Sequence, residues 1–263
     1  YCADGMHNNS FWEETLYENK KMIIHAKQVS GINNFEINTF EQLREADANS
    51  DNLNSETIAL IAEVFHTKES FIKNITVLKK GMTNRSFSFM VENERYIMRI
   101  PGQGTEKLIN REREYQVYKT IENIGICDEI YYINPDNGYK ITKFIQNAKT
   151  CDANNWDEVS KCIAVLKKFH NKNLQVEHTF DLFEQLEFYE SLWDGNSCYR
   201  DYQITKENIY RLKSYIENQD KQWTLTHIDA NADNFLIWSD NDGKERINLI
   251  DWEYAGMQDA HLD

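Results

Sequence analysis

The segment from Thr226 to Tyr254 constrains the fold of this chain more than any other part of the sequence. It reads THIDANADN at 226–234 and IDWEY at 250–254, separated by an apolar run, the turn SDNDGKER and a second apolar run. These two runs, at 234–238 and 246–250, predict the strands of a hairpin. The hairpin would return the second motif to the loop that carries the first.

Three oxygen-bearing side chains are expected to meet there. Asp229 follows the His, Asn234 lies five residues further on, and Asp251 ends the second strand. Phosphoryl transfer needs such a set, because one carboxylate orients the attacking hydroxyl and accepts its proton while hard oxygen ligands hold Mg²⁺ against the phosphates. We assign the first role to Asp229 and the second to Asn234 and Asp251. An amide ligand also limits repulsion between carboxylates.

The pattern His-x-Asp-x-x-x-x-Asn is weak evidence when taken alone. A solvated acidic loop with a structural histidine would also contain it, and acidic loops are common in a chain of net charge -14. Two further features favour the phosphoryl-transfer interpretation. An apolar, strand-like run at 223–226 precedes the motif, and Asp251 stands at a strand end followed by Trp252 and Tyr254.

The rest of the chain predicts an α+β fold with two lobes. Before residue 146 the patterns predict a small antiparallel sheet with one helix, from strands at 72–80, 86–92, 95–100, 129–133 and 139–145 and a helix at about 106–123. A shorter helix, with Ser55 as its cap, is expected at 55–65. After residue 153 helices are predicted at 154–171, 180–193 and 204–219, followed by the strand at 223–226.

Domain boundaries follow from these patterns. The small polar stretch DANSDNLNS at 47–55 is the best linker candidate. We predict a first segment at 1–50, a sheet-rich lobe at 51–145 and a helix-rich lobe at 146–263, with the seam near Phe144–Ala148.

Composition excludes several classes of protein. A net charge of -14 disfavours nucleic acid and anionic membranes as partners. No apolar run approaches the length of a membrane span, and no signal-peptide pattern opens the chain. Five cysteines without CxxC spacing indicate a reducing cytoplasm rather than a disulfide framework or a zinc site. The oligomeric state is not indicated.

Residues 70–263 resemble the bacterial branch of the choline/ethanolamine kinase family, which belongs to the aminoglycoside-phosphotransferase-like group of protein-kinase-fold enzymes. The matching segments occur in family order and with family spacing. They are KKGMTNRSF at 79–87, YIMRIPGQGTEKLINREREY at 96–115, KITKFI at 140–145, LKKFHN at 166–171, THIDANADN at 226–234 and LIDWEYAGMQD at 249–259.

The resemblance implies ATP and Mg²⁺ as cofactors and a role for each matching residue. Asp229 corresponds to the catalytic base, and Asn234 and Asp251 correspond to the Mg²⁺ ligands. Arg99 corresponds to the basic residue that contacts the ATP phosphates, with Glu114 as its partner on the helix.

The segment 81–86 corresponds to the turn that covers the phosphates, so Gly81, Thr83, Asn84 and Ser86 are candidate contacts. The stretch 141–146 corresponds to the hinge whose backbone holds adenine.

Each of these roles has a simpler alternative. Arg99 and Glu114 could form an ordinary surface ion pair, and Gly81 could be a plain hairpin glycine. His227 is interpreted as a structural residue that holds the loop, and His170 as a residue that packs at a helix end.

Two departures from protein kinases stand out. Ile228 occupies the place of the arginine before the catalytic Asp, so control by phosphorylation of an activation loop is not expected. The DFG triplet is replaced by Asp251-Trp252-Glu253, so a switch based on a flipping phenylalanine is not expected either.

The resemblance implies choline as the small-molecule substrate. A quaternary ammonium is recognised by aromatic faces and nearby carboxylates, so the candidate contacts are Tyr254, Glu253, Trp252 and Asn231, although Trp252 fits a core position better. Alternatives are ethanolamine, an aminoglycoside, another amino alcohol, or a non-catalytic nucleotide-binding module. Because the family's further aromatic walls come after the Asp251 motif, the pocket is expected to be incomplete in a chain that ends at Asp263.

Residues 8–46 resemble the C-terminal end of a choline-phosphate cytidylyltransferase-like nucleotidyltransferase. The ending Glu-Ile-Asp-Ser of those enzymes appears here as Glu36-Ile37-Asn38-Thr39, before a predicted helix. The resemblance implies that a longer parent protein joins a cytidylyltransferase to a choline kinase, with no cytidylyltransferase activity in this piece. An unrelated helical extension is the alternative.

Overall fold

The computed structural model describes residues 56–78, 84–102, 104–193, 195 and 197–263, all of which belong to one compact unit. The predicted elements before residue 55, the linker and the cap Ser55 lie outside the described residues. So do Gly81 and Thr83, and so does the nucleotidyltransferase-like segment at 8–46.

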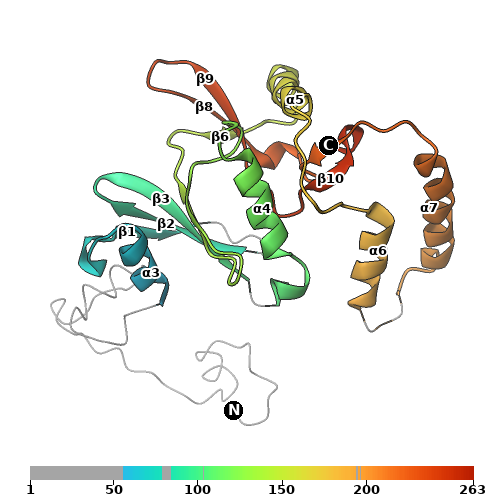
Figure 1. Cartoon of the computed structure of the whole chain (residues 1–263), viewed down its shortest axis with the longest axis horizontal. Coiled ribbons are helices and arrows are strands. Elements are labelled where there is room, and N and C mark those ends of the chain that lie inside the picture. The colour runs from blue at the N-terminus through green and yellow to red at the C-terminus, as the bar shows by residue number, and fades with distance from the viewer. Residues whose placement is uncertain (1–55, 79–83, 103, 194, 196) are drawn as a thin grey trace, which may run out of the picture. The chain divides into compact units, whose positions relative to one another are not determined.

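A five-stranded antiparallel sheet forms the first half of the described chain (Figure 1). Its spatial order is β1-β2-β3-β5-β4, so β3 is central. The strands are β1 (Lys73–Val77), β2 (Asn84–Val91), β3 (Glu94–Pro101), β4 (Ile130–Ile133) and β5 (Lys140–Lys143). The five strands expected before residue 146 are confirmed, with somewhat different ends.

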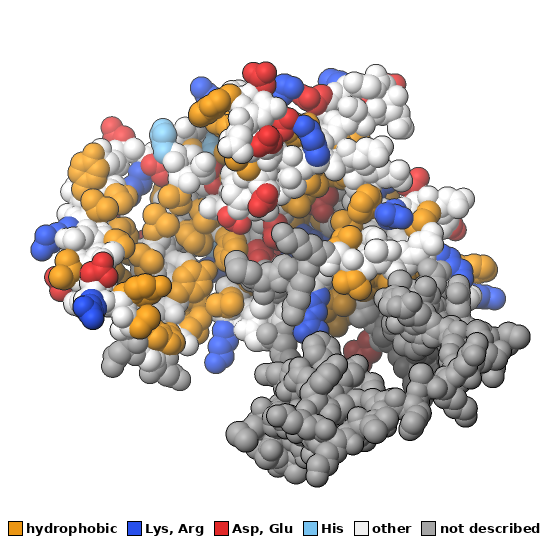
Figure 2. Space-filling view, turned by 180° about the vertical axis from the view of Figure 1, so that it is seen from behind, with side chains coloured by type: hydrophobic (Ala, Val, Ile, Leu, Met, Phe, Trp, Pro, Cys, Tyr) orange, Lys and Arg blue, Asp and Glu red, His pale blue; other side chains and the backbone are white. Residues whose placement is uncertain are grey.

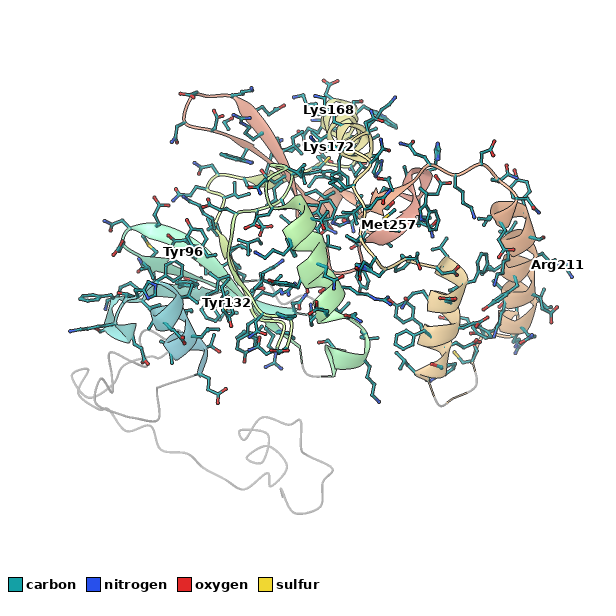
Figure 3. All side chains as sticks on the ribbon, in the orientation of Figure 1. Tyr96, Tyr132, Lys168, Lys172, Arg211 and Met257 are labelled. Atoms are coloured by element: carbon teal, nitrogen blue, oxygen red, sulfur yellow. The ribbon has the colours of Figure 1, made fainter. Side chains whose placement is uncertain are left out.

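Helix α3 (Glu56–Val64) contributes Ile58 and Ile61 to an apolar cluster with side chains of this sheet. Just after the helix, the ring of Phe65 lies 4.5 Å from that of Tyr96, measured between centroids. Tyr96 and Tyr132, both labelled in Figure 3, belong to the same cluster. Burial of these rings from separate strands fixes the register of the sheet, since a slip of one residue would turn them to the other face.

Helix α4 (Arg111–Ile121) begins later than the predicted residue 106. Asn110 is its N-cap, because the side chain of Asn110 accepts a hydrogen bond from the backbone N–H of Arg113 at 3.0 Å. The residues before it form a separate 3₁₀ turn at Thr105–Lys107. This start places both Arg111 and Glu114 in the first turn of the helix.

The second half of the chain packs against α4. It contains α5 (Trp156–His170) and two small sheets, formed by β6 (Lys149–Thr150), β8 (Phe235–Ser239) and β9 (Glu245–Leu249), and by β7 (Trp223–Thr226) and β10 (Gly256–Asp259). The core combines Val117 and Ile121 of α4 with Phe169, Trp252 and Met257. Met257 is labelled in Figure 3. The sequence did not predict β6 and β10, which are two and four residues long.

Helices α6 (Leu182–Ser191) and α7 (Tyr202–Glu217) bury little of their apolar surface. Only Phe183 of α6 is buried, and no residue of α7 is. Their apolar side chains gather at the left of Figure 2 and line a groove of about 290 Å³. None of the helices in the described part of the chain combines the length and apolar character that crossing a membrane requires.

Candidate active site

The loop between β7 and β8 holds Asp229 in a defined orientation. The amide Nδ2 of Asn234 donates to the backbone oxygen of Asp229 at 2.8 Å and to its carboxylate Oδ2 at 3.0 Å. Asn231 donates to the other carboxylate oxygen, Oδ1, at 2.8 Å. The loop therefore fixes the carboxylate through two amide donors, and the orientation of the Asn234 amide leaves its oxygen Oδ1 for a cation.

The hairpin of β8 and β9 brings Asp251 beside this loop. Phe235 pairs with Leu249, and the backbone N–H of Ile250 donates to the backbone oxygen of Asn234 at 3.0 Å. Asp251 follows with a φ of 69°, in the left-handed region that only a few residue types adopt readily. The predicted meeting of the two motifs is thus present in the backbone, and a strained residue stands at its centre.

The surroundings of Asp251 suit a cation. Burial, and next the nearby charge of Glu253, raise the pKa of the Asp251 carboxyl to about 6, although Lys140 and Arg99 act in the opposite direction. None of the described residues donates a hydrogen bond to this carboxylate. The described residues contain no group of three His, Cys, Asp or Glu that could hold a metal. Mg²⁺ does not need one, because it is held by one or two protein oxygens together with substrate phosphates and water. Asp251 and Asn234 fit that requirement.

His227 holds the two motifs together, as the structural interpretation expects. Its Nε2 lies 2.9 Å from the backbone oxygen of Ile250, and its Nδ1 accepts from the N–H of Asp229 at 3.2 Å. These partners require a proton on Nε2 and a free Nδ1, which is the neutral form. Burial lowers the pKa of His227, in agreement with this form.

The structure corrects the assignment of Trp252 as a substrate contact. This side chain is fully buried, and its indole N–H donates to the backbone oxygen of Leu249 at 2.8 Å. Its ring packs against Phe169 and His227, with centroid distances of 5.0 and 4.6 Å. Trp252 packs in the core against the loop that contains His227, and neither face of its ring is accessible to a ligand.

Asp263 anchors the same loop, and sequence reasoning missed it. Its carboxylate, which has no exposed surface, accepts from the backbone N–H of His227 at 2.8 Å and of Ile228 at 2.6 Å. The carboxylate also lies 2.9 Å from Nε2 of His170 at the end of α5. Ile228 has a φ of 77°, so Asp263 stabilises an unfavourable backbone conformation directly before Asp229. Only its position in the fold marks Asp263, since no motif surrounds it.

Arg99 and Glu114 form a buried ion pair rather than the surface pair considered as an alternative. Their side chains are 7% and 1% exposed, and Nη2 of Arg99 lies 2.9 Å from Oε2 of Glu114. Burial alone would raise the pKa of Glu114, but the charges of Arg99 and then Lys140 hold it at about 2. The second cation, Lys140, comes from β5 and lies 3.8 Å from Glu114. Lys140 also contacts the hydroxyl of Tyr118.

Two other predicted contacts point into this network. Asn84, at the start of β2, donates from Nδ2 to Oε2 of Glu253 at 2.9 Å. The side chain of Glu253 is 2% exposed, so the assignment of Glu253 to the substrate is corrected as well. Ser86 lies on β2 directly opposite Arg99 in the strand register. Trp252 and Glu253 are adjacent in the IDWEY motif, yet the first side chain packs in the core and the second lies in the ion network.

Tyr254 is partly exposed and has an aromatic neighbour on α6. Burial, then Glu253, Tyr189 and Asp251, raise the pKa of the Tyr254 hydroxyl. Asp229 makes a smaller contribution in the same direction. Tyr189 is 39% exposed. Two tyrosine rings and several carboxylates therefore share one region, and Tyr189 is a candidate that no sequence motif indicated.

An antiparallel sheet with α4 against it, a polar loop and a hairpin that ends in Asp251 together define a kinase-like α+β fold. Comparison with known proteins agrees. The family model described as choline/ethanolamine kinase matches residues 75–263. The chain therefore belongs to the choline/ethanolamine kinase family.

The individual relatives are distant in sequence. Two LicA proteins of Haemophilus influenzae are 26% and 25% identical over 70% and 69% of this chain. The chain spans 54% of the length of the first and 68% of the second.

Solved structures agree with this fold. The crystal structure of the choline kinase LicA from Streptococcus pneumoniae is 27% identical, with a TM-score of 0.66, over 78% of this chain and 72% of that one. An aminoglycoside phosphotransferase that was solved in its apo form, 17% identical, has a TM-score of 0.51 over 77% of this chain and 73% of that one, and shares the fold alone.

Proposed function

We propose that this protein transfers the γ-phosphate of ATP to the hydroxyl of choline. The observation that carries the proposal is the meeting of Asp229, Asn234 and Asp251 through the hydrogen bond between Ile250 and Asn234. The likeness to a choline kinase from Streptococcus pneumoniae supports the choice of acceptor.

In the proposed reaction Asp229 acts as the general base. Asn231 and Asn234 hold its carboxylate in place before substrate binds, so no reorganisation is needed when the hydroxyl arrives. The proton of the attacking hydroxyl passes to a carboxylate oxygen of Asp229 as the bond to phosphorus forms. Mg²⁺, held by Asn234 Oδ1 and Asp251, would neutralise charge on the phosphates.

The nucleotide would bind between the sheet-rich lobe at 51–145 and the helix-rich lobe at 146–263. We assign adenine to the backbone of 141–146. We assign the phosphates to the turn at 81–86 and to the guanidinium group of Arg99. Support comes from the position of Arg99 in the network that includes Glu253, two residues after Asp251: its Nη1 lies 4.0 Å from Oε2 of Glu253.

Choline would bind at Tyr254 and Tyr189, with Asp229 and Asp251 nearby. A quaternary ammonium has no hydrogen to donate, and it is attracted by ring faces and by negative charge. Tyr254 is partly exposed, and the charges of Asp251 and Asp229 act on its hydroxyl, while its neighbour Tyr189 is 39% exposed. Ethanolamine could bind the same carboxylates through hydrogen bonds, and it remains the second candidate acceptor.

Release of ADP by the purified protein tests the proposal. We expect turnover with choline, Mg²⁺ and ATP, and slower turnover with ethanolamine or hygromycin B. ADP binding without turnover of any acceptor would contradict the proposal and support a non-catalytic nucleotide-binding module. Faster turnover of ethanolamine than of choline would move the acceptor to the second candidate.

Replacing Tyr254 or Tyr189 by leucine is expected to raise KM for choline by roughly 3- to 30-fold, because a cation–π contact contributes about 0.5–2 kcal/mol. Phenylalanine at either position keeps the ring face and should leave KM close to the wild-type value. The matched control is Tyr199→Leu, since Tyr199 is 74% exposed. Steady-state kinetics with varied choline give the result. If Tyr254→Leu and Tyr189→Leu had the same KM for choline as Tyr199→Leu and the wild type, neither ring would belong to the choline site.

A further inference from the structure

Arg111 is a buried cation for which the sequence motifs suggested no role. It is the first residue of α4, and its side chain is 10% exposed. One guanidinium nitrogen, Nη1, lies 2.8 Å from Oε2 of Glu114 and 3.1 Å from Oε2 of Glu253. The other, Nη2, donates to Oδ1 of Asn84 at 3.1 Å. A single guanidinium group thus contacts three separate parts of the chain.

Arg111, Asn84 and Glu253 form a closed ring of hydrogen bonds. Arg111 donates to both of the others, and Asn84 donates to the same Glu253 oxygen that Arg111 contacts. Asn84 belongs to the segment 81–86, which is proposed to cover the phosphates. Glu253 lies two residues after Asp251, the proposed metal ligand. The ring therefore joins the two parts of the site that must act on one Mg·nucleotide complex.

The neighbouring charges explain why an arginine is needed here. Three cations, Arg99, Arg111 and Lys140, face Glu114, Glu253 and Asp251 in a space with little access to water. Loss of one cation would leave a buried carboxylate undercompensated. The planar fork of arginine satisfies several acceptors at once, whereas the single ammonium of lysine cannot reproduce that geometry.

We propose that Arg111 is a positioning residue that couples the metal-binding loop to the phosphate-covering segment. It acts through Glu253, which lies two residues after Asp251 on the same loop, and through Asn84, the first residue of β2. The inference rests on the proposed function, because it takes the ligand to be a Mg·nucleotide. It goes beyond that function by assigning the coupling between metal and nucleotide to one side chain that touches neither.

The test measures how much Mg²⁺ strengthens the binding of ADP. Calorimetric titration gives Kd for ADP in excess Mg²⁺ and in EDTA, for the wild type and for Arg111→Met, Arg111→Lys and Arg113→Met. We expect Mg²⁺ to lower Kd in the wild type. The ratio of the two Kd values should fall about tenfold or more in Arg111→Met and also in Arg111→Lys, which keeps the charge. Arg113→Met is the matched control, since Arg113 is exposed on the same turn and should keep the wild-type ratio.

A purely structural role predicts a different outcome. In that case both Arg111 variants would unfold at a lower temperature, while the Kd ratio of the folded protein stayed at the wild-type value, and the proposal would be overturned. A wild-type affinity for ADP that does not respond to Mg²⁺ would overturn it too. If Arg111→Met does not fold, Arg111→Lys decides, because it preserves the buried charge.

The same experiment separates this inference from the proposed function. ADP binding does not require an acceptor, so the Kd ratio can be measured whether or not choline is phosphorylated. A wild type that fails to turn over choline, together with a lost Mg²⁺ response in the Arg111 variants, would reject the acceptor and retain the coupling role. Full choline turnover by the wild type, together with an unchanged Kd ratio in the Arg111 variants, would support the acceptor and reject the coupling role.

Discussion

Replacement of Asp229 by asparagine is expected to lower kcat for choline phosphorylation by about two to four orders of magnitude, the usual contribution of a general base. Asparagine has nearly the same shape and still accepts hydrogen bonds through its amide oxygen, but it cannot take the proton of the attacking hydroxyl. The affinity for Mg·ADP should change little, because Asp229 is assigned to the acceptor rather than to the nucleotide. Initial rates of ADP release and a parallel ADP titration give both quantities.

Asp233→Asn is the matched control for this experiment. Asp233 lies four residues further along the same loop, its side chain is exposed, and the change in charge is identical. We expect wild-type kcat from this variant. An Asp229→Asn protein that keeps wild-type turnover would rule out Asp229 as the base, and equal losses in both variants would point to loop charge in general.

Replacement of Asp263 by alanine is expected to destabilise the protein by about 3–5 kcal/mol, since each buried N–H left without a partner costs about 1–3 kcal/mol. The lost acceptor serves the backbone N–H groups of His227 and Ile228, and the carboxylate also faces His170. Because Ile228 already has a positive φ, the loop should relax and move Asp229. Urea unfolding measures the stability, and kcat of the folded fraction measures the displacement.

Two variants serve as comparisons. Asp263→Asn keeps an acceptor oxygen without the charge and should lose less stability than the alanine variant. Asp242→Ala removes an exposed carboxylate in the β8–β9 turn and should stay within about 0.5 kcal/mol of the wild type. Wild-type stability in Asp263→Ala would show that water replaces the carboxylate at the two N–H groups.

The local patterns predicted the framework of this protein well. Alternating apolar residues and polar turns marked the five strands of the sheet, because a strand with one buried face repeats every two residues. The hairpin that returns Asp251 to Asn234 was predictable for the same reason. The start of α4 was predicted about five residues too early, because residues 106–110 also have a plausible helical sequence. In the structure Asn110 caps the helix, so the helix begins only at Arg111.

The direction of single side chains could not be predicted in the same way. Trp252, Glu253 and Tyr254 are consecutive, yet the first lies in the core, the second in the ion network and the third in a partly exposed region. The positive φ of Asp251 breaks the regular alternation of the strand just before them. Beyond that point a periodic pattern no longer tells which residue faces which side.

The sequence by itself determined the strand and helix order and the motifs that carry Asp229, Asn234 and Asp251, because these depend on short-range periodicity and turn chemistry. Only the tertiary structure decided that Asp263 holds the loop that carries Asp229, that Lys140 joins Arg99 and Glu114, and that Arg111 connects Asn84 to Glu253. These contacts of Asp263 and Arg111 join residues from 27 to 142 positions apart. Such partners are selected by burial, since a charge removed from water requires an opposite charge or a hydrogen-bond partner wherever the fold brings one close.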